Sequence, residues 1–176
     1  MRPWIKAIVI AVVHAALVAA LGAPQRIDRA TLPRVWVLTA PYDPTLPIRG
    51  RYVRMRMAVE VRGVSPSDSP RVWHAKAVRL RVEGDRLVAE TAPDLRDASP
   101  SELRVVRFVP DASGGMLGVI DRPLAFFIPE HVDDPARRPQ GERLWVEVTV
   151  PRAGPPRPIR LGVQKGDGPI VPLETG

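Results

Sequence analysis

Cysteine is absent from this chain of 176 residues, and aromatic residues make up only 5% of it. The lack of cysteine excludes disulfide bonds, thiolate catalysis, iron–sulfur clusters and cysteine-bound zinc. The scarcity of aromatic rings argues against the stacking platforms of proteins that bind single-stranded nucleic acids. Histidine occurs only three times, which leaves few candidates for a general base or a metal ligand.

Proline, by contrast, is abundant at 21 residues, about twice its usual share of roughly 5%. Because proline ends helices and is excluded from central strand positions, this number argues against a helical bundle. Hydrophobic residues at 45% and charged residues at 26% are typical of a globular chain. The net charge of +7 makes nucleic acid, anionic lipid and acidic proteins the partners to consider.

The only long apolar run lies between Trp4 and Leu21, and basic residues stand at its start. A cleavable signal peptide has a charged start, an apolar stretch of about 7–15 residues and small residues at the cut. An uncleaved anchor needs about 17–25 apolar residues, and residues 7–23 reach the lower end of that range. Both interpretations stay open from the residues alone. His14 is interpreted as a tolerated polar residue, because a single helix offers it no partner.

Either interpretation sends the rest of the chain across a membrane, since long proline-rich segments translocate largely regardless of charge. We therefore divide the chain into a membrane anchor or signal peptide over 1–24, a juxtamembrane linker over 25–33, and a β-rich extracytoplasmic domain over 34–176.

The clearest pattern in the body of the chain is alternation, which predicts strands. Residues 51–62 place five apolar side chains on one face and mainly polar ones on the other, as a half-buried strand does. Residues 78–82 repeat the pattern, and Gly84-Asp85 then predicts a tight hairpin into 87–91. Further strands are expected over 35–39, 103–109, 116–120, 124–128, 144–150 and 159–163. Short strands at this spacing predict an all-β fold, a compact antiparallel sandwich or partly open barrel, after one amino-terminal helix.

Motifs for catalysis are sparse. The chain has no Gly-x-Ser-x-Gly and no Ser-x-x-Lys, and its Gly-Gly and Gly-Asp-Gly segments precede no helix that would make a phosphate-binding loop. The loop from Glu130 to Asp134, with His131 and Asp133, carries oxygen and nitrogen ligands. It is better interpreted as a solvated loop, and His74 as a half-exposed packing residue of a strand. We therefore expect no catalytic residues, no metal site, no cofactor and no identified small-molecule substrate.

Four arginines form a candidate basic patch on the strands over 51–62 and 78–82: Arg54, Arg56, Arg79 and Arg81. A basic sheet face with an aromatic neighbour is how single-stranded nucleic acids are bound. Export of the body makes that partner unavailable, so we expect no nucleic-acid partner. The simpler interpretation is a solvated face that can lie against anionic lipid headgroups.

The segment from Thr39 to Met57 resembles the signature of the GDYXXLXY family, small bacterial proteins with an amino-terminal membrane segment. Arg51 stands where the family has aspartate, and Met55 and Met57 stand where it has leucine and a second tyrosine. The matching residues are Pro41, Asp43, Pro44, Arg49, Gly50 and Tyr52. These are suited to structural roles, because Asp-Pro makes a rigid turn and Gly50 permits a bulge. We expect the ring of Tyr52 to pack over that turn.

The resemblance implies an envelope location and partnership with an integral membrane protein, and it favours the anchor over the cleaved signal. We expect a non-enzymatic accessory or interaction module, single-pass in the bacterial inner membrane with its β domain in the periplasm. The alternative is a periplasmic hydrolase or metal-binding enzyme that uses the loop over 130–134 with His74.

Overall fold

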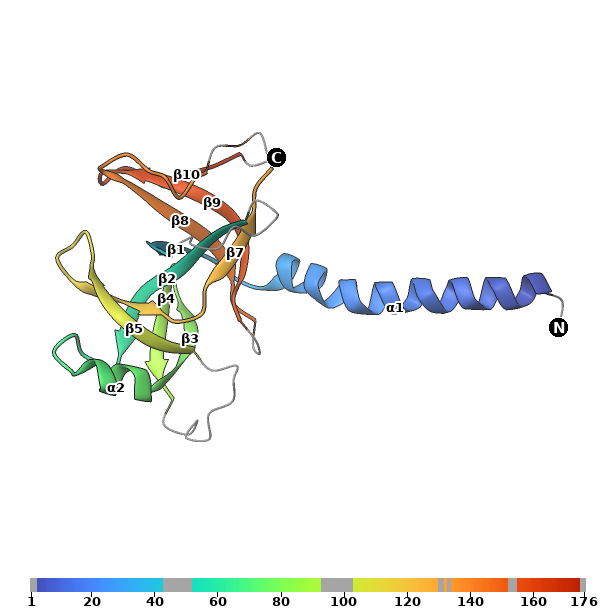
Figure 1. Ribbon diagram of the computed structural model, residues 1–176, viewed down its shortest axis with the longest axis horizontal. Coiled ribbons are helices and arrows are strands. Elements are labelled where there is room, and N and C mark those ends of the chain that lie inside the picture. The colour runs from blue at the N-terminus through green and yellow to red at the C-terminus, as the bar shows by residue number, and fades with distance from the viewer. Residues whose placement is uncertain are drawn as a thin grey trace. The chain divides into compact units, whose positions relative to one another are not determined.

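The computed structural model describes residues 3–42, 52–92, 103–129, 132, 134–151 and 155–174. The chain divides into two compact units, Met1–Leu32 and Pro33–Gly176 (Figure 1). The first contains one long helix and the second contains all the strands.

The first unit is the helix α1, which runs over Pro3–Thr31. Its segment Trp4–Ala23 has a mean hydropathy of 2.3, and none of it is buried. Twenty residues of helix span about 30 Å, the thickness of a bilayer's hydrocarbon core. The helix also continues through residues 25–31 of the expected linker. The chain therefore carries one exposed apolar helix near its amino terminus, consistent with a signal sequence or a single-pass anchor.

His14 lies on this helix without disturbing it. Its ring Nδ1 is 2.9 Å from the carbonyl oxygen of Ile10, one turn earlier, and the imidazole donates a hydrogen bond there in the tautomer protonated at that nitrogen. A local backbone partner satisfies part of the ring's polarity. This agrees with its interpretation as a tolerated polar residue.

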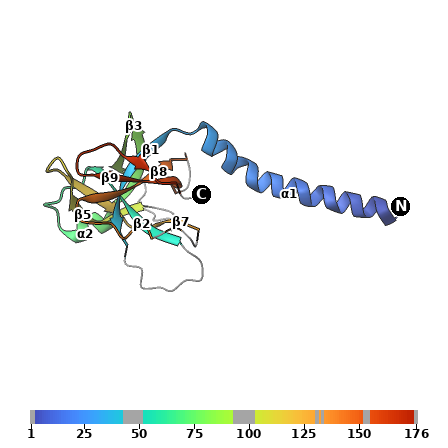
Figure 2. The same ribbon diagram turned by 90° about the horizontal axis from the view of Figure 1, so that it is seen from above.

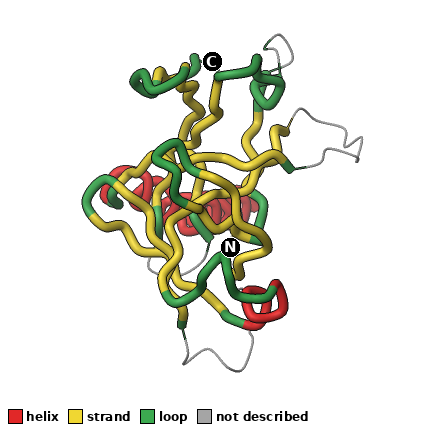
Figure 3. Tube along the Cα trace, turned by 90° about the vertical axis from the view of Figure 1, so that its left-hand side faces the viewer, coloured by secondary structure: helices red, strands yellow, loops and turns green. Residues whose placement is uncertain are grey.

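The second unit is built from strands, and the all-β prediction is confirmed (Figure 3). Apart from the segment around His74, each strand segment expected from alternation is present, with ends that differ by a few residues. The strands are β1 (Arg34–Pro41), β2 (Tyr52–Arg62), β3 (Ala77–Glu83), β4 (Arg86–Thr91), β5 (Leu103–Pro110), β6 (Met116–Ile120), β7 (Leu124–Phe127), β8 (Glu142–Thr149), β9 (Arg157–Lys165) and β10 (Val171–Pro172). The two-residue β10 was not expected.

These ten strands form one sheet in the order β10-β9-β8-β1-β2-β4-β3-β5-β6, with β7 paired to β2 (Figure 2). The pairs are antiparallel except for β2 with β4, which run parallel. Since β6 also pairs with β2, the strands β2, β4, β3, β5 and β6 close a ring. The result is a mostly antiparallel sheet with partial ring closure.

β2 pairs with four other strands, β1, β4, β6 and β7. It pairs with β1 and β7 near Met55, and with β1 and β6 at Ala58, so neighbours lie along both of its edges. The predicted alternation is visible in its burial: Val53, Met55, Met57 and Val59 are all at most 4% exposed. These side chains enter a core that also includes Val146 and Leu161.

The β3–β4 hairpin turns at Gly84-Asp85, as predicted. Of these two turn residues, only Gly84 has a positive φ, of 62°. All the described residues with a positive φ are glycines. Asp85 does not take a positive φ, although aspartate tolerates that conformation in tight hairpins. Glycine has no Cβ to oppose the left-handed region, so it supplies the whole reversal.

A short helix, α2 (Pro70–Ala75), replaces the strand expected around His74. Pro70 stands in its first turn, where the missing N–H costs nothing. Trp73 anchors the helix, because its Nε1 donates to the Ser65 carbonyl at 3.0 Å and its ring meets Phe108 edge-on, with centroids 4.9 Å apart. Tertiary contacts therefore determine this segment, since six residues are too few for an independent helix.

Ring closure depends on a small residue in β6. Gly118 lies opposite Phe108 of β5 and Val59 of β2. A Cβ at Gly118 would overlap the Cγ2 of Val61 and lie 3.1 Å from the Cγ1 of Val105. Only glycine lets β6 pair with both neighbours while these valines fill the core.

Replacing Gly118 by alanine is therefore expected to lower the free energy of unfolding by about 1–3 kcal/mol through overpacking. Thermal unfolding of the full-length protein in detergent, followed by tryptophan fluorescence, measures this. Gly115→Ala is the matched control, since its Cβ would meet only Ser113 Oγ, at 3.7 Å. The control should change stability by less than about 0.5 kcal/mol. Equal unfolding temperatures for the two variants would contradict the role of Gly118.

Candidate functional site

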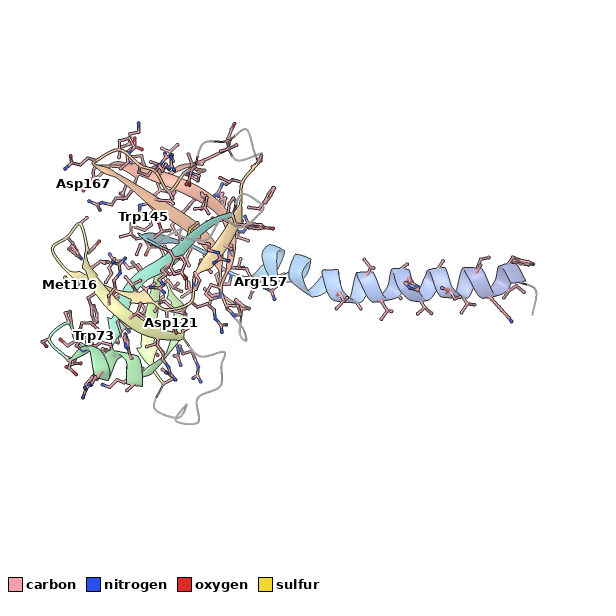
Figure 4. All side chains as sticks on the ribbon, viewed as in Figure 1. Trp73, Met116, Asp121, Trp145, Arg157 and Asp167 are labelled. Atoms are coloured by element: carbon pink, nitrogen blue, oxygen red, sulfur yellow. The ribbon has the colours of Figure 1, made fainter. Side chains whose placement is uncertain are left out.

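The second unit contains a groove of about 610 Å³ that we call the tryptophan groove. Its walls come from the outer face of β1 and β8, from the β3–β4 turn and from the β5–β6 hairpin. Figure 4 labels Trp145 of β8 and Met116 of β6, which line it from two different walls. The apolar side chains that line it include those of Trp36, Leu38, Leu87, Met116, Trp145 and Ile170.

Strand alternation places both tryptophans on the outer face of the sheet. Val37 and Val146 are buried on the core side, at 3% and 0% exposed, so their neighbours Trp36 and Trp145 face outward. In the β1–β8 register, Trp145 lies opposite Leu38. The two indoles therefore stand on adjacent strands of one surface.

Polar partners hold each indole in place. The guanidinium of Arg160 lies 5.4 Å from the ring centroid of Trp36, and its Nε donates to the carboxylate of Glu147 at 2.8 Å. The Nε1 of Trp145 donates to the Oε1 of Gln164 at 3.0 Å. Since Glu147 is only 6% exposed, its pairing with Arg160 compensates a buried charge while orienting the cation over the ring.

Gly162 of β9 makes room for this wall. A Cβ there would lie 2.9 Å from Cη2 of Trp36 and 2.8 Å from Cγ2 of Ile170. In the β8–β9 register it lies opposite Trp145. The absence of a side chain at Gly162 thus lets the edge of Trp36 and Ile170 pack against the outer face of the sheet.

The facing wall is the β5–β6 hairpin. A small second core of Ala40, Ala58 and Val119, with Leu117 packed against it, joins this hairpin to the outer face of β1 and β2. Met116, at the start of β6, is 42% exposed. The hairpin is therefore fixed at its base, while its tip contributes side chains to the groove.

Charged residues from three elements line the groove. Glu60 comes from β2, Asp85 from the β3–β4 turn and Asp111 from the β5–β6 loop, and Arg86 is the one cation among the lining residues. A hydrogen bond from the Ser113 hydroxyl, backbone N–H groups and the nearby Arg143 hold the pKa of Asp111 below its ordinary value. The groove thus combines aromatic surface with carboxylates.

Most of the expected signature residues lie outside the described part of the chain. These are Asp43, Pro44, Arg49 and Gly50. Pro41 ends β1 opposite Met55. The turn over which Tyr52 was expected to pack lies outside the described residues, and Tyr52 itself is 54% exposed. It packs edge-on against Phe127, with centroids 5.5 Å apart, because the two residues pair across β2 and β7.

The four arginines of the candidate basic patch do not form one basic surface. Arg79 pairs with Glu90, and Glu90 pairs with Arg62 of β2, so these three residues form one row across the strands. Arg62 is six residues along β2 from Arg56, a distance of about 20 Å. Arg81 Nε is 3.3 Å from the Glu90 carboxylate, so that end is a mixed-charge network. Arg54 and Arg56 stand apart on β2, and the guanidinium of Arg56 lies 4.7 Å from the ring centroid of Tyr42.

The residues of the alternative enzyme site are only partly described. Glu130, His131 and Asp133 lie outside the described residues. His74 is exposed on α2, and its Nε2 is 3.3 Å from the carbonyl oxygen of Val106. Within the described ranges, no group of three or more histidine, aspartate or glutamate side chains could hold a metal ion.

The tryptophan groove was missed by the sequence analysis, although a signal for it exists. Trp36 and Trp145 each stand between two buried apolar residues of a strand, so alternation places a large aromatic on the solvent side. A partly exposed tryptophan in a chain with few aromatic residues is a candidate contact residue.

Comparison with known proteins adds no assignment: no family model matches the chain, and no curated protein or solved structure matches it. The resemblance to the GDYXXLXY family therefore stays a prediction.

Proposed function

We propose that this protein is a non-enzymatic, membrane-anchored interaction module of the bacterial envelope that partners an integral membrane protein. The observation that carries the proposal is the combination of two features in one chain. An exposed apolar helix precedes a strand-rich unit, and that unit presents a groove with two oriented tryptophans.

The anchor part of the proposal rests on the exposed surface of α1. Leu17, Val18 and Leu21 are 57–76% exposed, and the other apolar residues of the segment are similarly open. Exposing this much apolar surface to water is costly, at about 25 cal/mol per Å². The hydrocarbon core of a bilayer, which is about 30 Å thick, removes that cost because it surrounds the helix with apolar groups instead of water. The resemblance to the GDYXXLXY family supports an uncleaved anchor in the inner membrane, with the β unit in the periplasm.

The binding part of the proposal rests on the preorganisation of the two indoles in the groove. Tryptophan is enriched at the energetic centres of protein interfaces, because it buries a large area with little loss of conformational freedom. Here the partners Arg160 and Gln164 already orient both indoles. A partner would therefore meet a formed surface rather than one that must be ordered on binding.

The mature protein is expected to keep residues 4–21 and to remain with membranes after washing in alkaline carbonate, because the helix inserts in the bilayer. Cell fractionation and amino-terminal sequencing measure this. The contradicting result is a mature chain that starts near Ala23 and is found in the soluble periplasmic fraction.

Co-purification is expected to depend on the groove. Tagged full-length protein from detergent-solubilised membranes should recover an integral membrane protein, and Met116→Lys should reduce that recovery about tenfold, equivalent to about 1.4 kcal/mol. Val171→Lys is the matched control, since Val171 is also exposed, at 59%, but does not line this groove. Thermal unfolding should be similar for both variants, because each changes an exposed side chain. Recovery of soluble proteins only would contradict the proposed function.

A further inference from the structure

We infer that the tryptophan groove binds a basic segment of a polypeptide, with a lysine or arginine side chain lying against the tryptophan wall and its cationic end at the carboxylates of the rim. This inference rests on the proposed function, and it names the chemistry of the partner. Its basis is the charge of the groove, the freedom of its carboxylates and the nature of its apolar wall.

The charge of the groove is opposite to that of the chain. Among the described lining residues, Glu60, Asp85 and Asp111 stand against Arg86, and the Arg160 guanidinium over the Trp36 ring is already paired with Glu147, while the whole chain carries +7. A negative depression on a positive protein attracts a cationic group and repels anionic lipid or nucleic acid.

The carboxylates are available to a ligand to different degrees. Within the described part of the chain, Asp85 makes no ion pair or hydrogen bond, and it is exposed at the hairpin turn. The Ser113 hydroxyl donates to the Asp111 carboxylate at 2.7 Å and lowers the pKa of Asp111. Glu60 has only a long contact of 3.8 Å to Arg62 at an exposed position, which is weak in water. Asp85 is therefore the carboxylate that a cation engages at the least cost.

The wall suits the rest of a basic side chain. Long cationic side chains pack their aliphatic stems on apolar surface while the charged end reaches a polar partner. The guanidinium of Arg160 over the Trp36 ring is already paired with Glu147, so the charged end of a bound side chain belongs at the rim carboxylates and not at this ring. The apolar residues Leu38 and Met116 line the same groove and can cover the stem.

The test is a peptide titration of the full-length protein in a neutral detergent. The probes are acetyl-Ala-Lys-Ala-Lys-Ala-amide and its glutamate counterpart, and the readout is the indole N–H resonance of each of the four tryptophans. The lysine peptide should shift the signals of Trp36 and Trp145 but not those of Trp4 and Trp73. The glutamate peptide should shift none, and added salt should weaken the binding of the lysine peptide.

Asp85→Asn supplies the site-specific comparison. It keeps a residue that tolerates the turn and removes one charge, so the dissociation constant for the lysine peptide should rise about three- to fivefold. Asp167→Asn is the matched control: Asp167 is a turn residue between β9 and β10 that does not line the groove (Figure 4). That variant should bind as the unchanged protein does.

Several outcomes would overturn the inference. They are equal binding of the two peptides, no shift up to about 10 mM peptide, an unchanged affinity in Asp85→Asn, or indole shifts caused by a chitin trisaccharide but not by the lysine peptide. The inference and the proposed function can fail separately. Recovery of a membrane protein without lysine-peptide binding removes the inference alone. Lysine-peptide binding without any membrane protein recovered removes the accessory function alone.

Discussion

The pairing of β2 with four other strands is the constraint on which the strand-rich unit depends. β1 and β7 hydrogen-bond to opposite edges near Met55, and β6 and β4 pair farther along. Because β6 returns to β2, five strands close a ring, and the apolar face of β2 becomes the centre of the core. This closure is possible only where β6 has no side chain, at Gly118, since Val61 and Val105 occupy the space that a Cβ would need.

The tryptophan groove follows from the same arrangement. The ring draws the β5–β6 hairpin over the outer face of β1 and β2, where Ala58 and Val119 are buried in a small second core. That face carries Trp36 and Trp145 on its adjoining strands, and Gly162 gives the first indole room to pack. The groove therefore lies between a fixed aromatic wall and a hairpin whose loop contributes Asp111, and Glu60 of β2 and Asp85 of the β3–β4 turn add two more carboxylates. The groove is acidic in a basic chain because the fold brings carboxylates from separate loops and strands to one place.

Much of the fold could be predicted from local patterns, and the candidate site could not. Alternation in residues 52–62 correctly assigned the buried face of β2, and Gly84-Asp85 correctly placed a hairpin. The short helix at Pro70–Ala75 was missed because its stability comes from the contact of Trp73 with Phe108, far along the chain. Tyr52 is exposed, as its place on the polar face of the alternating strand indicates.

The sequence by itself determined the apolar helix and the set of strands, because chain length, hydropathy and a two-residue period are local properties. It also determined which side of each strand faces the core. Only the tertiary structure decided which strands are neighbours, and so which outward-facing residues meet. Arg79 and Arg81 came to lie among carboxylates, while Asp85 and Asp111 came to line a groove with Trp36. Strand pairing between distant segments makes these choices, and no local pattern in the chain records them.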